Sequence, residues 1–222
     1  MLKLNETIKP HLSEKVLFAG SELSGSKYAM ILLHGRGGNA ESMLSLANEF
    51  ELEDTLVIAP QADNFTWYPY RFIEKREVNE PGISSGLVLI NSIMNSLGQS
   101  RIKSENVFIL GFSQGACLAL DYTVRFPKKY AGVFVLSGGL IGDEIVDNDY
   151  KGDLQDTPIF LGCSDVDFHI PEKRVHKSAE IAKLLNAEVK TKIYPNMEHT
   201  INHDEINMIN QILSNHYKLS VI

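Results

Sequence analysis

Cysteine is scarce in this chain of 222 residues, which contains two, Cys117 and Cys163. Two thiols cannot form a disulfide framework, and their spacing matches no zinc-binding pattern. Both lie within apolar stretches, so we expect them to be reduced and buried. The sequence therefore predicts neither a disulfide-stapled secreted domain nor a structural metal site.

The chain also lacks long apolar runs and an excess of basic residues. Residues 1–6 contain no apolar core of a signal peptide, and apolar runs such as Ala29–Leu33 are far shorter than the roughly 20 residues that span a bilayer. Lysine and arginine number 21 against 28 aspartates and glutamates, which gives a formal net charge of −7. Because nucleic acid and anionic membranes favour a concentrated basic face, we expect neither as a partner. We expect a cytoplasmic protein without stable membrane insertion.

No repeat, low-complexity segment or Pro/Gly/Ser-rich linker divides the chain, so we expect a single domain over residues 1–222. Short apolar runs rich in β-formers alternate with amphipathic helical patterns. Several runs are almost continuously apolar, which is typical of central parallel strands covered on both faces. We therefore predict an α/β fold, a mostly parallel central sheet flanked by helices, with active groups at the carboxyl ends of the strands. The expected strands are Lys15–Ala19, Ala29–Leu33, Leu56–Ala59, Val107–Leu110, Gly132–Leu136, Ile159–Leu161 and Val189–Tyr194, and the expected helices are Ala40–Phe50, Ile83–Leu97, Gly115–Phe126, Glu172–Asn186 and His203–His216.

A candidate nucleophile stands between one of these strands and the helix that follows it. Residues Gly111–Gly115 read GFSQG and match G-x-S-x-G, with Ser113 at the centre. The flanking glycines allow a sharp turn that raises the serine hydroxyl above the sheet, as a nucleophile elbow requires. The next helix also directs its N-terminus at the site, which favours developing negative charge. A Gly/Ser turn without chemistry is the alternative reading, and the strand before and the helix after argue against it.

A base and an acid should follow the serine in the order Ser, acid, His. Of the seven histidines, His199 is the best candidate base, because it lies in a turn between the last strand and the final helix. His203 and His216 instead fit the polar face of that helix. In the loop after Ile159–Leu161, Asp165 and Asp167 compete as the acid, and spacing alone does not separate them.

Five segments carry a family resemblance: Leu33–Gly38 (LHGRGG), Gly111–Gly115, Asp167–Pro171 (DFHIP), Met197–Thr200 (MEHT) and the stretch Ala59–Gln61 with Trp67-Tyr68. They resemble the phospholipase/carboxylesterase family of α/β-hydrolases, the group that includes acyl-protein thioesterases. The family's acid lies four residues before a proline, which here points to Asp167. The resemblance also implies an oxyanion hole made by the backbone N–H groups of Arg36 and Gln114. Phe168 and Glu198 depart from the family pattern, which usually has proline and glycine at these positions.

The implied reaction is hydrolysis of short-to-medium acyl or aryl esters through an acyl-enzyme, with no metal or organic cofactor. An acyl thioesterase, including an acyl-protein thioesterase, is the close alternative, and a non-catalytic ligand-binding protein on the same fold is the alternative of another class. We expect a small-molecule ester or thioester as the partner, and the sequence leaves room for a homodimer. No long insertion follows Leu136-Ser137, so we expect no large cap or lid domain. The aromatic-rich segment 64–81 follows a strand end, and Trp67 and Tyr68 are the expected pocket residues.

Overall fold

The structure is a computed structural model, which describes residues 2, 4, 7–12 and 15–219; residues 1, 3, 5 and 6 of the N-terminal segment considered above lie outside the described residues. Seven strands in this part form one sheet in the order β1-β3-β2-β4-β5-β6-β7. Only β1 runs antiparallel to its neighbour, β3, and the other pairs are parallel. All seven expected strands are confirmed, with small shifts at their ends. They are β1 (Val16–Gly20), β2 (Tyr28–Leu33), β3 (Thr55–Pro60), β4 (Val107–Phe112), β5 (Gly132–Leu136), β6 (Pro158–Ser164) and β7 (Glu188–Tyr194).

The five expected helices are also present. The first ends at Leu46 and continues as a 3₁₀ turn at Ala47–Glu49 instead of reaching Phe50. Asn39 caps this helix, because its side chain accepts a hydrogen bond from the backbone N–H of Ser42 at 2.8 Å. The helices are α1 (Ala40–Leu46), α2 (Gly82–Gln99), α3 (Gln114–Arg125), α4 (Glu172–Leu184) and α5 (His203–Leu219), and further 3₁₀ turns lie at Asp63–Phe65, Arg76–Asn79, Ser104–Asn106 and Asp147–Asp149.

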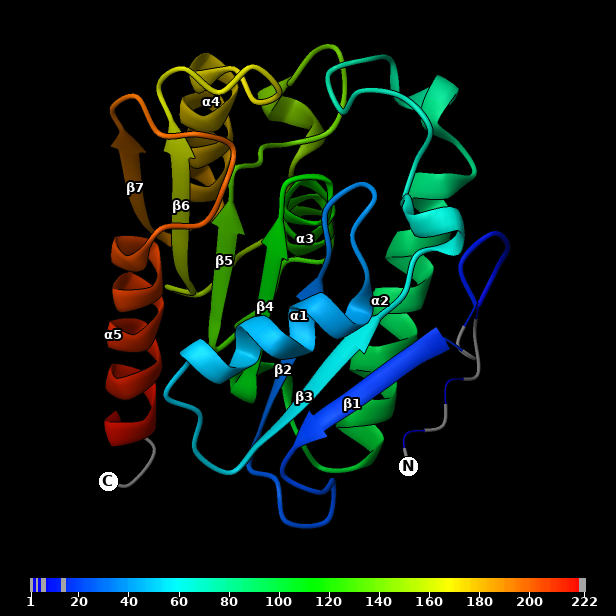
Figure 1. Cartoon of the computed structure of the whole chain (residues 1–222), viewed down its shortest axis with the longest axis vertical. Helices are drawn as coiled ribbons and strands as arrows, with labels where there is room; N and C mark the ends of the chain where they lie inside the picture. Colours follow the sequence, from blue (N-terminus) through cyan, green and yellow to red (C-terminus); the bar gives the residue numbers. More distant parts are fainter. Residues whose placement is uncertain (1, 3, 5–6, 13–14, 220–222) are drawn as a thin grey trace.

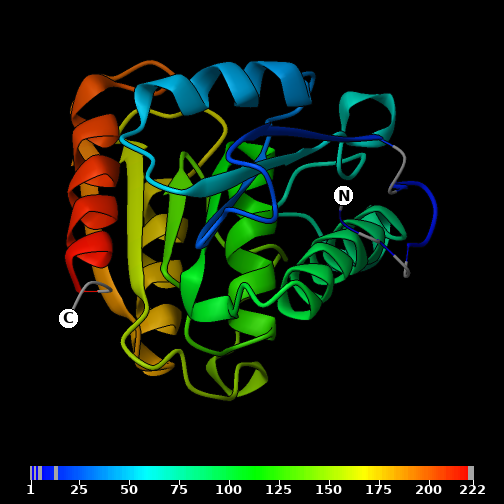
Figure 2. The same ribbon diagram turned by 90° about the horizontal axis from the view of Figure 1, so that it is seen from below.

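Helices cover both faces of the sheet, which explains the almost continuous apolar strands (Figures 1 and 2). Along β2, Ala29, Ile31 and Leu33 pack into a core shared with α2, α3 and α4. Met30 and Leu32, which point the opposite way, pack into a second core with α1 and α5. Each of these five side chains is fully buried. Side chains that alternate between two apolar layers leave no face of the strand for polar residues.

The parallel strands bring their carboxyl ends to one edge of the sheet, the upper edge in Figure 1. The turns after β2, β4, β6 and β7 therefore meet there, although they are far apart in sequence. Between β5 and β6, the described chain contains only the 3₁₀ turn Asp147–Asp149, so no cap domain is inserted at that point. Within the described residues, none of the helices is both long and apolar enough to cross a membrane.

Candidate active site

Ser113 occupies a strained turn between β4 and α3. Its backbone has φ 54° and ψ −116°, a conformation that residues with a Cβ rarely adopt. The neighbouring backbone is tightly packed, because a Cβ at Gly111 would meet the Gly115 carbonyl and one at Gly115 would meet the Leu33 carbonyl. The Ser113 N–H donates to the Leu136 carbonyl at 2.9 Å, which ties the turn to β5. This is the elbow that the G-x-S-x-G pattern predicts.

The structure brings His199 and Asp167 together with this serine. His199 Nε2 lies 2.8 Å from Ser113 Oγ, and His199 Nδ1 lies 2.7 Å from Asp167 Oδ2. Because a carboxylate only accepts, the proton of the neutral imidazole belongs on Nδ1, which leaves Nε2 free to accept from the serine hydroxyl. Three turns, after β4, β6 and β7, thus place their side chains in one hydrogen-bonded chain.

Asp167 is held ionised although its side chain is fully buried. Burial alone would raise the pKa of this carboxyl, but hydrogen bonds from His199 and from the backbone outweigh that effect and hold the pKa below its ordinary value. Its Oδ1 accepts the N–H groups of His169 at 2.8 Å and Ile170 at 3.1 Å. A fixed anion beside Nδ1 both orients the imidazole and stabilises it once it is protonated.

Asp165, the competing candidate, lies elsewhere in the same loop. Its Oδ1 accepts a hydrogen bond from the Asn196 N–H at 2.8 Å, and its own N–H donates to the Tyr194 carbonyl at 3.2 Å. These contacts join the loop after β6 to the turn after β7, which carries His199. Asp165 therefore contacts the backbone of that turn, and Asp167 contacts the imidazole.

The two backbone amides expected to form an oxyanion hole belong to the turn after β2 and to the turn after β4. Gln114 is the first residue of α3, where helical N–H groups have no partner within the helix. Among the described residues, no hydrogen bond occupies the N–H of Arg36 or that of Gln114. Gly35, just before Arg36, packs against Phe112 and Ser113, so the two turns adjoin. Both amides are available to a developing oxyanion.

A cavity of about 1010 Å³ opens at Ser113 and His199. Tyr68 lines it, as expected from the sequence, but the structure does not place Trp67 there. The Trp67 ring is fully buried, and its indole N–H donates to the His34 carbonyl at 2.9 Å. Much of the cavity wall was missed in sequence analysis. Phe72 and Val78 belong to the segment 64–81 that the sequence indicates, whereas Cys117, His169 and Ile170 are lining residues that it does not.

His169 is the least expected of these lining residues, since its sequence position suggested only a loop. Its ring lies 5.0 Å from that of His199, centroid to centroid. The signal was present in the sequence, because a residue two positions after the acid must lie close to the base that this acid holds. Phe168, between them, points outward and is 86% exposed.

Both cysteines are buried and free, as expected. Burial raises the pKa of the Cys117 thiol to about 12. Burial, together with the nearby Asp167 carboxylate, raises the pKa of the Cys163 thiol to about 12 as well. Neither thiol is therefore activated as a nucleophile at neutral pH, although Cys117 lines the cavity.

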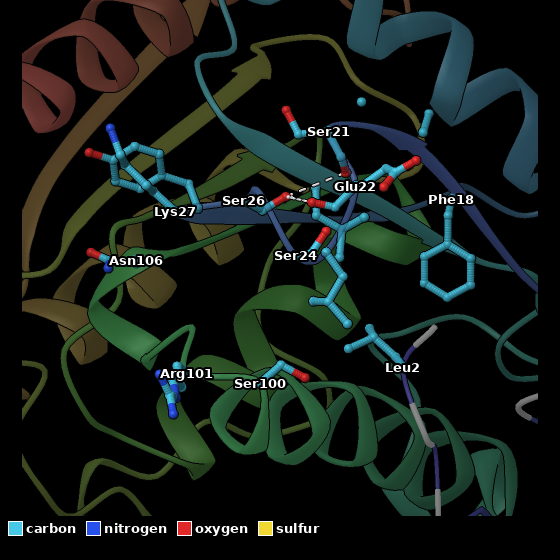
Figure 3. A pocket seen from close by; sticks show the side chains of 15 residues that line it. Leu2, Phe18, Ser21, Glu22, Ser24, Ser26, Lys27, Ser100, Arg101 and Asn106 are labelled. Carbon is cyan, nitrogen blue, oxygen red and sulfur yellow. Dashed lines mark hydrogen bonds between the residues drawn. The ribbon is translucent and has the colours of Figure 1, made fainter.

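A second cavity, of about 1000 Å³, lies near the end of β1 and the start of β2 (Figure 3). Its wall includes four serines, Ser21, Ser24, Ser26 and Ser100, but no histidine. Ser26 Oγ donates to the Glu22 carbonyl at 2.8 Å, so this hydroxyl serves the local turn. Within the described residues, no cluster of histidine, cysteine or acidic side chains is arranged to hold a metal ion. The candidate catalytic side chains therefore lie at the first cavity, the one lined by Ser113 and His199.

The comparisons with known proteins agree with this geometry. A model of the Phospholipase/Carboxylesterase family matches residues 21–217. The chain belongs to this family. It is 29% identical to acyl-protein thioesterase 1 of Kluyveromyces lactis over 223 aligned positions, which cover 90% of this chain and 96% of that protein.

Solved structures extend the likeness to three dimensions. A phospholipase/carboxylesterase from Dyadobacter fermentans shares 38% identity, covers 95% of this chain and 100% of its own, and superposes with a TM-score of 0.89. The esterase PE8 superposes with a TM-score of 0.76 at 20% identity, covering 90% of this chain and 97% of its own, and shows the fold alone. The fold is thus that of the α/β-hydrolases, and this member of the family is a carboxylic ester hydrolase, a serine esterase or thioesterase.

Proposed function

We propose that the protein hydrolyses short-to-medium acyl or aryl esters, with Ser113 as the nucleophile, His199 as the base and Asp167 as the orienting acid. The observation that carries the proposal is the continuous chain from Ser113 Oγ through His199 to the buried Asp167 carboxylate, at 2.8 and 2.7 Å. The nucleophile and base lie within hydrogen-bonding reach, and a third group orients the base, which is the arrangement that activates a serine hydroxyl.

The reaction proceeds in two halves. His199 Nε2 takes the Ser113 proton as Oγ attacks the carbonyl carbon, and the carbonyl oxygen becomes an oxyanion. His199 then gives that proton to the departing alkoxide or aryloxide, the bond between it and the carbonyl carbon breaks, and an acyl-Ser113 ester remains. Water, deprotonated by His199, attacks this ester, and the proton returns to Ser113 as the acid leaves.

The oxyanion is stabilised by the N–H groups of Arg36 and Gln114, which no internal hydrogen bond occupies among the described residues. Such preorganised amides stabilise charge in the transition state more than in the bound ester. Gln114 N–H also belongs to the N-terminus of α3, whose dipole favours an anion.

The cavity supports an apolar acyl or aryl group. Tyr68, Phe72 and Ile170 are buried side chains that contribute apolar wall, and Val78 adds an exposed apolar residue at the cavity. A volume of about 1010 Å³ lies at the upper end of ordinary ligand pockets and suits a chain longer than acetate. We therefore expect the specificity constant to rise from acetyl to medium acyl esters.

A p-nitrophenyl ester series from acetyl to decanoyl, with wild type and Ser113→Ala, tests the proposal. Wild type should hydrolyse the series, and Ser113→Ala should lower kcat by about 10⁴-fold or more, since removing a nucleophile that acts as a unit with its base costs this much. Equal turnover by the two proteins would exclude Ser113 as the nucleophile. A folded wild type that neither turns over an ester nor reacts with a fluorophosphonate probe would support the ligand-binding alternative.

A thioesterase is the second candidate, favoured by the likeness to acyl-protein thioesterase 1 across 90% of this chain. The site is the same, because an acyl-Ser113 intermediate forms from either substrate. Kinetics with an oxygen ester and a thioester of the same acyl group distinguish the esterase from the thioesterase. The substrate with the larger kcat/KM is the preferred one.

A further inference from the structure

The short segment Thr66–Tyr70 contributes to the cavity wall. It is held to the rest of the site by side-chain hydrogen bonds from Arg36 and Gln114. Tyr68, Pro69 and Tyr70 line the cavity. The segment carries little regular structure of its own, since it follows the 3₁₀ turn Asp63–Phe65 and precedes the turn at Arg76–Asn79. Its position therefore depends on contacts made by other residues.

The Arg36 guanidinium makes four of these contacts. Its Nη1 donates to Thr66 Oγ1 at 3.1 Å and to the Pro69 carbonyl at 2.8 Å. Its Nη2 donates to the carbonyls of Tyr68 at 2.9 Å and Tyr70 at 2.6 Å. Among the described residues, no carboxylate forms an ion pair with Arg36. The planar fork of donors thus serves backbone carbonyls rather than an acidic partner.

The Gln114 carboxamide holds the same segment from the buried side. Its Oε1 accepts the Trp67 N–H at 2.8 Å and the Thr66 hydroxyl at 3.2 Å, and its Nε2 donates to the Tyr68 carbonyl at 2.7 Å. Gln114 is only 5% exposed, so these bonds are shielded from water. A buried amide group destabilises the folded protein unless its oxygen and nitrogen are hydrogen-bonded, and here both atoms are paired.

The two side chains converge on one atom. The Tyr68 carbonyl oxygen accepts from Arg36 Nη2 and from Gln114 Nε2, and the Thr66 hydroxyl oxygen lies 3.1 Å from it. Arg36 and Gln114 are also the two residues whose backbone N–H groups the proposed function assigns to the oxyanion. Each residue therefore offers its amide to the reacting centre and its side chain to the wall of the acyl cavity.

We propose that the Arg36 guanidinium and the Gln114 carboxamide are positioning groups that tie Thr66–Tyr70 and both oxyanion amides into one rigid unit. The fit of the acyl group against the wall is then coupled to the alignment of the oxyanion hole. This inference rests on the proposed function, because it assigns the amides of Arg36 and Gln114 to the oxyanion.

The test replaces the guanidinium and leaves the Arg36 backbone N–H in place. Arg36→Met should lower kcat by about 10- to 100-fold on every ester of the series while KM for the acetyl ester stays within about twofold, because misplaced donors weaken the transition state rather than the bound ester. Arg36→Lys should recover part of kcat, and added guanidinium ion should rescue Arg36→Ala. Active-site titration with a fluorophosphonate normalises each rate to the number of folded sites.

Lys75→Met is the matched control. Lys75 is an exposed cation in the same loop and has no side-chain hydrogen bond or ion pair within the described part of the chain. Its variant should keep wild-type kcat, which separates positioning from loss of positive charge. Should Arg36→Met fold poorly, Thr66→Val, which removes a hydroxyl bonded to both positioning groups, should lower kcat in the same manner.

Two results would overturn the inference. One is a wild-type kcat in folded Arg36→Met and Thr66→Val, with only the melting temperature lowered. The other is an equal fall of kcat in Lys75→Met. Either result, obtained alongside Ser113-dependent turnover by wild type, would reject the positioning role and leave the proposed function intact; loss of Ser113 dependence would instead reject the proposed function.

Discussion

Asp165 and Asp167, in the loop after β6, form hydrogen bonds with different partners. Asp167 binds the imidazole of His199 and is buried, whereas Asp165 binds the Asn196 N–H of the neighbouring turn. Spacing in the sequence left both open as the acid, because their separation of two residues is set by the local turn rather than by a periodic element. The register between β6 and β7, which pairs Ser164 with Tyr194, brings the loop that carries both aspartates beside the turn that carries His199.

Asparagine substitutions at the two positions should therefore have unequal effects. Asp167→Asn keeps the size of the side chain but removes the charge that fixes the Nδ1 proton, and kcat should fall by about 10⁴-fold. Asp165→Asn keeps a side-chain oxygen for the Asn196 N–H, so kcat should stay within about tenfold of wild type. Steady-state kinetics on one ester measures both, and a larger loss in Asp165→Asn would reverse the assignment.

The thiol of Cys117 should be inert although it lines the cavity. Because burial raises its pKa to about 12, almost no thiolate exists at pH 7.5, and thiolate is the reactive form. Iodoacetamide should leave esterase activity unchanged over hours in folded wild type. Rapid inactivation that Cys117→Ala abolishes would show that the thiol is accessible and ionised.

At the scale of elements, the turn that carries His199 is fixed by the start of α5. The Glu205 N–H donates to Asn202 Oδ1, and the Asn202 N–H donates to Glu205 Oε2, both at 2.9 Å. This reciprocal pair is a capping box that caps the N-terminus of α5. Its first residue, Asn202, lies three residues after His199. The Asn-x-x-Glu spacing is visible in the sequence, but its burial is not. Glu205 is fully buried, and its Oε1 has no hydrogen-bond partner among the residues that the structure describes.

This carboxyl should make stability depend on pH. Burial raises the pKa of Glu205 from 4.5 to about 7, so the folded state favours the neutral form. A raised pKa in the folded state means that the contribution of Glu205 to stability is fully present below about pH 4.5 and is lost as pH rises through about 7. Glu205→Gln cannot ionise at this position. Its free energy of unfolding should therefore exceed that of wild type by an amount on the order of 3 kcal/mol at pH 8.

Urea unfolding of both proteins between pH 4.5 and 8.5 measures this difference. Groups other than Glu205 titrate in both proteins, so subtracting one free energy of unfolding from the other isolates its effect. Glu205→Asp is a control, since a shorter acid still ionises. A difference that does not change with pH would mean that folding leaves the pKa of Glu205 at its ordinary value.

On the scale of the whole molecule, the sheet was the most predictable part and the cavity wall the least. Strands such as β2 are buried in two cores at once, and this produces continuous apolar runs that are legible in the sequence. The proposed nucleophile, base and two oxyanion positions lie in short motifs whose residues are adjacent. The cavity wall instead combines Phe72 and Val78 with Ile170, which are distant in sequence and share no pattern.

The position of Trp67 shows why aromatic content alone does not predict which side chains line the cavity. A bulky ring after a strand end predicts a pocket wall or a loop anchor equally well, and its direction depends on which partner takes the indole N–H. Here the partner is the His34 carbonyl, and the ring turns inward between His34 and His11, with centroids at 5.2 and 5.1 Å. Tyr68, one residue later, turns to the cavity.

Since Trp67 is the only tryptophan, its fluorescence reports on the contact between the cavity wall and the core. We propose that residues 1–222 unfold as one cooperative domain. Thermal transitions followed by tryptophan fluorescence and by far-ultraviolet circular dichroism should then coincide within about 1–2 °C, as two-state unfolding requires. An earlier fluorescence transition would show that the wall separates from the core before the sheet unfolds.

The backbone of Ser113 carries a conflict between folding and turnover. At φ 54° and ψ −116°, a residue with a Cβ is strained by about 1–3 kcal/mol relative to an ordinary conformation. Glycine would relieve that strain, so Ser113→Gly should melt at a higher temperature than wild type while losing its hydrolytic activity. Selection for stability alone would thus remove the hydroxyl, and a serine persists at position 113 only as long as acyl transfer contributes to fitness.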